Sequence, residues 1–100
     1  MASPQRTKSL PDVPAIAEIL PGFESVTWYA VVAPPRTPAA IIEKGNAGIN
    51  QALHDSEVQK RLTDLSAEPV GGTPQETAKY LKQEAERWMN VITAAHVTLD

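Results

Sequence analysis

The sequence predicts an α/β fold with one main strand, a short second strand and about three helices. The main strand is predicted over 26–33, VTWYAVVA, because this segment is rich in β-branched and aromatic residues. Two helices are predicted where a threonine precedes a proline, at Thr37-Pro38 and Thr73-Pro74, each followed by apolar residues spaced three and four apart. The length of 100 residues corresponds to one domain or part of one.

The first part of the chain is expected to contain little regular structure. Residues 1–14 are predicted to be loop, because the prolines there disfavour helix at the residues before them. A short helical turn is predicted over 14–20, with Ile16, Ile19 and Leu20 facing inward. Pro21-Gly22 then ends this turn.

The predicted main strand, 26–33, is apolar on both faces. Such a strand is usually central in a sheet and covered on both sides. The only other strand candidate is a short piece near Val70, so either the sheet is very small or its remaining strands come from elsewhere. Pro34-Pro35 ends the main strand.

The first helix is predicted to start at Thr37-Pro38 and to carry an apolar stripe. Its stripe residues are Ile41, Ile42, Ile49, Ala52 and Leu53. Gly45 lies on that stripe, where it either permits a close backbone approach or weakens the helix. Asp55 is predicted to cap a second helix, whose inward face is formed by Val58, Leu62 and Leu65.

The last helix has the clearest start signal in the chain. Thr73, Pro74 and Glu76 form a capping box with proline at the first helical position, so the helix is predicted to begin at Pro74. Its apolar stripe consists of Ala78, Leu81, Ala85, Trp88, Ile92 and Ala95. We expect other parts of the chain to cover this stripe.

Composition excludes several classes of function. A net charge of −3 argues against nucleic acid as a partner, and the absence of cysteine excludes disulfides and thiolate chemistry. His54 and His96 have no companion metal ligands, so neither a metal, a cofactor nor a catalytic residue is predicted, and the chain is not expected to be an enzyme. Gly71-Gly72-Thr73 could bind an anion at a helix start, but a structural turn is the preferred interpretation.

Targeting signals are not evident in the chain as written. No apolar run approaches the ~20 residues of a membrane span, and the first residues have no apolar core typical of a secretion signal. On this basis a chain expressed as written is expected to remain in the cytoplasm.

An ordered set of residues resembles the C-terminal segment of Bug-type receptors, the extracytoplasmic solute-binding receptors of tripartite tricarboxylate transporters. The resemblance runs collinearly through Arg6, Leu10 to Pro14, Leu20 to Glu24, Trp28-Tyr29, Ala33-Pro34, Thr37-Pro38, Asn46, Ile49-Asn50, Glu68 to Pro74, Glu84 and Trp88. Most of a family receptor is missing from the chain, including its signal peptide, which suggests a truncated gene or an excised segment.

This resemblance implies the C-terminal portion of a type II periplasmic-binding-protein fold, with two lobes that close over a small carboxylate. Residues 1–25 would be a loop-rich remnant of the second lobe, and 26–100 would form a crossover strand and the C-terminal helices of the first lobe. The intact receptor would be periplasmic and would deliver its ligand to membrane permease subunits. Asp12 is the candidate ligand-binding residue, in a loop that would border the cleft.

Two other classes of function remain open from the sequence. The first is a small standalone interaction module that binds a partner or forms homo-oligomers through its uncovered strand. The second is an enzyme, for which the sequence offers nothing beyond histidines and scattered carboxylates.

Overall fold

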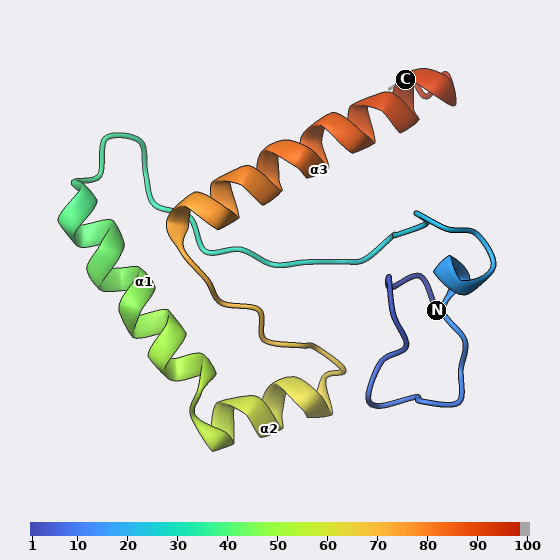
Figure 1. Cartoon of the computed structure of the whole chain (residues 1–100). Coiled ribbons are helices and arrows are strands. Elements are labelled where there is room, and N and C mark those ends of the chain that lie inside the picture. Colours follow the sequence, from blue (N-terminus) through green and yellow to red (C-terminus); the bar gives the residue numbers. More distant parts are fainter. Residues whose placement is uncertain (99–100) are drawn as a thin grey trace.

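The computed structural model describes residues 1–98 and consists of helices joined by extended segments (Figure 1). Its elements are a 3-10 helix η1 (Ile16–Glu18) and the α-helices α1 (Ala39–Leu53), α2 (Ser56–Asp64) and α3 (Pro74–Ala94). The segment before α1 runs alongside α3, and the chain then passes through α1 and α2 before it returns to the start of α3 (Figure 1). Helix α1 contacts both α2 and α3.

The predicted α/β fold class is wrong for the described residues, because no strand or sheet forms within residues 1–98. The predicted strand at 26–33 is extended, but its backbone forms no ladder hydrogen bonds with any part of the described chain. The short piece near Val70 is likewise unpaired. A β-strand needs a neighbour for its N–H and C=O groups, and the described residues supply none.

The capping residues in the sequence correctly predicted where α2 and α3 begin. Helix α3 begins at Pro74 as predicted, with the amide of Glu76 donating to Thr73 Oγ1 (3.1 Å) and that of Thr73 donating to Glu76 Oε2 (2.8 Å). Asp55 caps α2 by accepting from the amides of Glu57 and Val58. These caps form because they use residues within one turn of the helix.

The start of α1 differs from the prediction by one residue. Helix α1 begins at Ala39, after Pro38. The hydroxyl of Thr37 does not cap it but donates to the carbonyl of Pro34 at 2.8 Å. Gly45, within α1, has open space where a side chain would lie, so no other backbone segment of the described chain packs closely against it.

The molecule is open and has almost no core. Only Ala15 and Glu84 are buried among the described residues. The chain exposes 8637 Å², whereas a compact protein of its mass exposes about 5,500 Å². The Cα radius of gyration is 16.6 Å, compared with about 13 Å for a compact domain of this length.

The predicted apolar stripes are therefore only partly covered. Ile41 in α1 and Trp88 in α3 keep 61% and 41% of their surface exposed. Of the predicted stripe on α3, Leu81 is half-buried. The other buried or half-buried residues on this face of α3 are rotated from that stripe, namely Thr77, Tyr80, Glu84 and Arg87. The predicted inward residues Ile19 and Leu20 near η1 are also exposed.

Within residues 1–98, no helix combines the length and apolar character that crossing a bilayer requires.

Candidate functional site

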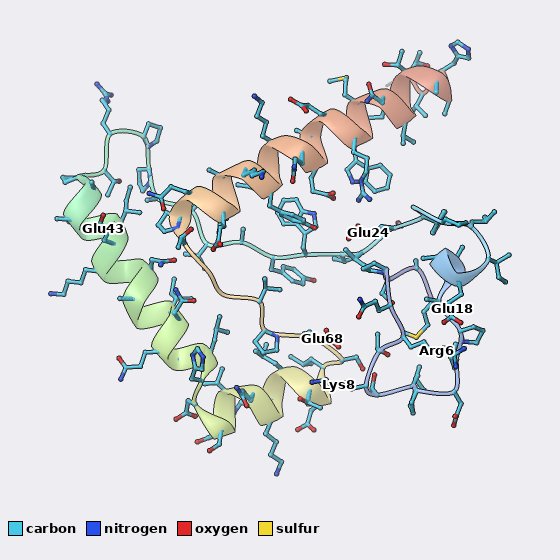
Figure 2. All side chains as sticks on the ribbon, viewed as in Figure 1. Arg6, Lys8, Glu18, Glu24, Glu43 and Glu68 are labelled. Carbon is cyan, nitrogen blue, oxygen red and sulfur yellow. The ribbon has the colours of Figure 1, made fainter. Side chains whose placement is uncertain are left out.

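The loop that contains the predicted ligand residue Asp12 is braced by an ion pair between Arg6 and Glu18. Arg6 donates from Nε and Nη2 to the two carboxylate oxygens of Glu18, at 2.7 and 2.8 Å, and from Nη1 to the carbonyl of Pro11 at 3.2 Å. The amide of Ala15 donates to the same carboxylate at 2.9 Å. Figure 2 shows Arg6 and Glu18 facing each other across the loop. The brace holds the backbone directly before Asp12.

Asp12 itself is exposed on the turn that follows Pro11. It lines neither the hollow on α3 near Met89 nor the hollow between the N-terminal loop and α2. The structure therefore brings Asp12 next to the braced backbone but not next to a second candidate ligand residue. Its role in binding stays a prediction.

The Glu18 brace should weaken in strong acid. The pKa of the Glu18 carboxyl is lowered from 4.5 to about 2, first by the hydrogen bonds from Arg6 and then by the amide of Ala15. Because this pKa is lower in the folded chain, the stabilisation is complete above pH 4.5 and is lost as the pH falls toward 2.

A carboxyl-detected NMR titration of Glu18 should therefore give a midpoint near pH 2 in the native chain. The matched variant Arg6→Met should move that midpoint up toward 4.5. A native midpoint already near 4.5 would show that the brace does not form in solution.

A polar hollow of about 340 Å³ lies where the N-terminal loop faces α2 and the segment after it. Its lining consists of Thr7, Lys8, Ser9, Gln59, Thr63, Ser66, Ala67, Glu68 and Pro69. Lys8 and Glu68, which come from opposite walls, lie on the same side of the molecule in Figure 2. Lys8 forms no ion pair with any described residue, so its ammonium group can bind an anion.

A second polar cluster joins α3 to the extended segment beside it. The carboxylate of Glu84 accepts hydrogen bonds from the indole N–H groups of Trp28 (3.2 Å) and Trp88 (3.3 Å), and from Arg87 Nη2 (2.9 Å). Arg87 also donates from Nη1 to the carbonyl of Glu24 at 2.9 Å. We call the group of Trp28, Glu84, Arg87 and Trp88 the Glu84 clasp.

Aromatic contacts support the Glu84 clasp. The ring of Trp28 meets that of Tyr80 edge to face, with centroids 5.7 Å apart, and the Arg87 guanidinium lies 5.4 Å from the Trp88 ring centroid. Burial, and then the negative charge of Glu84, raise the pKa of the Tyr80 hydroxyl. The clasp therefore keeps a carboxylate and a guanidinium away from most of the solvent.

From the sequence, Trp28 was assigned to a strand and Trp88 to an apolar stripe. The sequence did not predict that both indole N–H groups donate to the carboxylate of Glu84. A partial signal was present, because Glu84, Arg87 and Trp88 are spaced three and four residues apart on one helix face. Nothing local linked them to Trp28, which lies 56 positions away from Glu84.

The glycine turn before α3 serves a structural role, as preferred from the sequence. Asn50 in α1 donates to the carbonyl of Gly72 at 2.7 Å and accepts from its amide at 2.9 Å. The amide of Thr73 is occupied by Glu76. Since these amides already have partners, the helix start does not offer them to an anion.

The histidines lie apart from any cluster. The Nδ1 atom of His54 is 2.7 Å from the carbonyl of Asn50, near the end of α1, and His96 is exposed after α3. Among residues 1–98, no three histidine, aspartate or glutamate side chains gather closely enough to hold a metal ion.

Comparison with known proteins gives the chain a family. Residues 1–97 match the family model described as tripartite tricarboxylate transporter family receptor. The chain is 43% identical over 94 residues to a UPF0065 protein from the tcbD-tcbE intergenic region of Pseudomonas sp. strain P51, which covers 92% of this chain and 28% of that protein. It is 36% identical over 91 residues to protein BugT of Bordetella pertussis, which covers 90% of this chain and 28% of that protein.

A third relative is a UPF0065 protein from the clcB-clcD intergenic region of Pseudomonas knackmussii, 37% identical over 94 residues, which cover 92% of this chain and 56% of that protein. The chain thus spans between 28% and 56% of the length of these relatives. No solved structure matches the chain.

These matches confirm the resemblance to Bug-type receptors. They also confirm that the chain is not an enzyme, because the family consists of solute-binding receptors. The chain belongs to the family of tripartite tricarboxylate transporter receptors.

Proposed function

We propose that this chain is the C-terminal body of a periplasmic receptor that binds small carboxylates and delivers them to membrane permease subunits. In this proposal, residues 1–25 belong to the second lobe. Residues 26–100 form the crossover and the last helices of the first lobe. The remainder of the receptor supplies the other surfaces of both lobes.

The observation that carries this proposal is the amount of apolar surface left open. The described chain exposes roughly half as much surface again as a compact protein of its mass. Large side chains of the extended segments are almost fully exposed, with Tyr29 at 93% and Val70 at 94%. Exposed apolar side chains of this number and size mark a surface that another part of a protein covers.

The unpaired segment 26–33 adds a second argument. It carries no charge and no proline, and its backbone N–H and C=O groups have no ladder partner among the described residues. Edge strands left free in natural proteins usually carry charges or proline that prevent pairing. This segment is therefore suited to pairing with a strand from the rest of the receptor.

The polar hollow and the nearby loop are our candidates for the ligand-contacting part of this chain. Lys8 would attract the ligand carboxylate, while hydroxyl groups of Ser9 and Ser66 would donate hydrogen bonds to it. Glu68, on the wall opposite Lys8, would repel a fully ionised polycarboxylate and so favour ligands of low charge. Asp12 would lie at the border of the cleft between the two lobes.

The proposal can be tested by adding the missing part of the receptor in trans. The chain should form a one-to-one complex with the part of the Pseudomonas strain P51 relative that lies outside the matched 28%, detected by size-exclusion light scattering. The complex should also bind members of a panel of small mono- and dicarboxylates in isothermal titration calorimetry. A chain that remains separate, or that forms only dimers with itself, would instead support a standalone interaction module.

A lysine substitution tests the assignment of the hollow. Lys8→Met should weaken carboxylate binding by the complex at least ~10-fold, because a direct charge-assisted hydrogen bond is worth about 1.5 to 3 kcal/mol. The control Lys60→Met changes the same charge on an exposed face of α2 outside the hollow and should have little effect. Equal affinity in the two variants would place the ligand elsewhere.

A further inference from the structure

We propose that the Glu84 clasp is a hinge anchor, in which Arg87 fixes the peptide group between Glu24 and Ser25 and thereby sets the point where residues 1–25 turn against 26–98. This inference rests on the proposed two-lobed receptor, because only there does such a turn accompany ligand closure. Its structural basis can be examined in this chain without any ligand.

A single peptide group, between Glu24 and Ser25, contacts both parts of the chain. Its carbonyl, from Glu24, accepts from Arg87 Nη1 at 2.9 Å, and its N–H, from Ser25, donates to the carbonyl of Ala2 at 2.8 Å. One side of this planar unit is thus attached to α3 and the other to the N-terminal loop. The joint between the two parts is therefore located at this peptide.

The N-terminal part is held together by its own contacts. The carbonyl of Met1 accepts from the amide of Ile16 at 2.8 Å, and the Arg6–Glu18 pair closes the loop between them. Residues 1–25 are therefore connected internally and can turn as a unit.

The polar links between the two parts all involve Arg87 and Glu24 among the described residues. Among the hydrogen bonds of residues 1–98, the bond from Arg87 to Glu24 is the one that joins 1–25 to the rest of the chain. The carboxylate of Glu24 adds an ion-pair contact to Arg87 at 3.9 Å. Loss of Arg87 would therefore remove the hydrogen bond and the ion-pair contact that attach residues 1–25 to α3.

Arg87 is held in place by its neighbours on α3. Its Nη2 atom is bound by Glu84, whose side chain is only 8% exposed, and its guanidinium packs against the Trp88 ring. Glu84 is in turn fixed by Trp28. Because Arg87 is positioned before it reaches Glu24, little rotamer entropy is lost in the attachment.

The test uses the full chain, which has no cysteine, with nitroxide labels on Gln5→Cys and Gln83→Cys. These exposed positions lie in the N-terminal part and on α3, respectively. Double electron–electron resonance should show a distance distribution at least ~2-fold wider with Arg87→Met, while far-UV circular dichroism keeps the same helix content. Glu84→Gln, which keeps an acceptor but loses the charge, should widen it less. The control Glu86→Gln, on the exposed face of α3, should not change it.

An unchanged width with Arg87→Met would overturn the proposal. Loss of helix content with both Arg87→Met and Glu84→Gln would also overturn it, because the clasp would then be a general support of the fold. Failure of the complex to bind carboxylates would refute the proposed function but would leave the label distances unaffected. The two proposals can thus fail separately.

Discussion

Replacing Glu84 by alanine is expected to detach α3 from the extended segment beside it, at a cost of about 3 to 5 kcal/mol. The substitution leaves the indole N–H groups of Trp28 and Trp88 without their acceptor, and it leaves the Arg87 guanidinium without its nearest counter-charge. Arg87 Nε is already buried without a hydrogen-bond partner, so no spare acceptor near it could replace the lost carboxylate. A cost of this size is comparable to a large part of the stability of a small domain.

Urea denaturation followed by tryptophan emission measures this effect directly. The chain contains two tryptophans, and both donate to Glu84, so their emission reports on the clasp alone. The control Glu86→Ala removes a carboxylate two residues away whose nearest cation, Lys82, is 4.0 Å distant and exposed. It should change stability by less than about 0.5 kcal/mol. Equal midpoints for the two variants would show that the clasp contributes nothing measurable.

Replacing Gly71 by alanine is expected to destabilise the chain by about 2 to 4 kcal/mol. Gly71 has a φ of 66°, a left-handed conformation that alanine adopts only with strain. The new Cβ would also lie 2.5 Å from Asn50 Oδ1. That oxygen is held by the reciprocal pair with Gly72, so moving it breaks the link between α1 and the start of α3.

The matched control is the same substitution at Gly45. This glycine lies inside α1, and the space around its missing Cβ is empty. Gly45→Ala should therefore stabilise the chain by up to about 1 kcal/mol through helix propensity. Opposite signs for the two variants in thermal unfolding would confirm the contrast. Destabilisation by both would show that α1 is packed more closely than described.

How much the sequence could predict depended on the range of each interaction. The caps of α2 and α3 were predicted correctly, because Asp55 and Thr73 act on amides two or three residues away. The strand at 26–33 was wrong for the described chain, because its composition indicates what could pair but not whether a neighbour exists.

The candidate sites divide in the same way. Asp12 was selected through a family resemblance, and the structure adds the Arg6–Glu18 brace that holds its loop. The polar hollow was not predicted, because it joins the loop at Lys8 to α2 and residues beyond it, which only folding brings together.

The sequence by itself determined the family, the two well-capped helix starts and the absence of thiol chemistry, since these follow from residue identity and short spacing. The tertiary structure decided which face of α3 is used. Hydrophobic periodicity favoured Trp88 and Ile92, but the buried face centres on Glu84, because its carboxylate accepts hydrogen bonds both from Trp88 on α3 and from Trp28 in the distant extended segment. A polar contact between residues 56 positions apart leaves no periodic trace in a sequence.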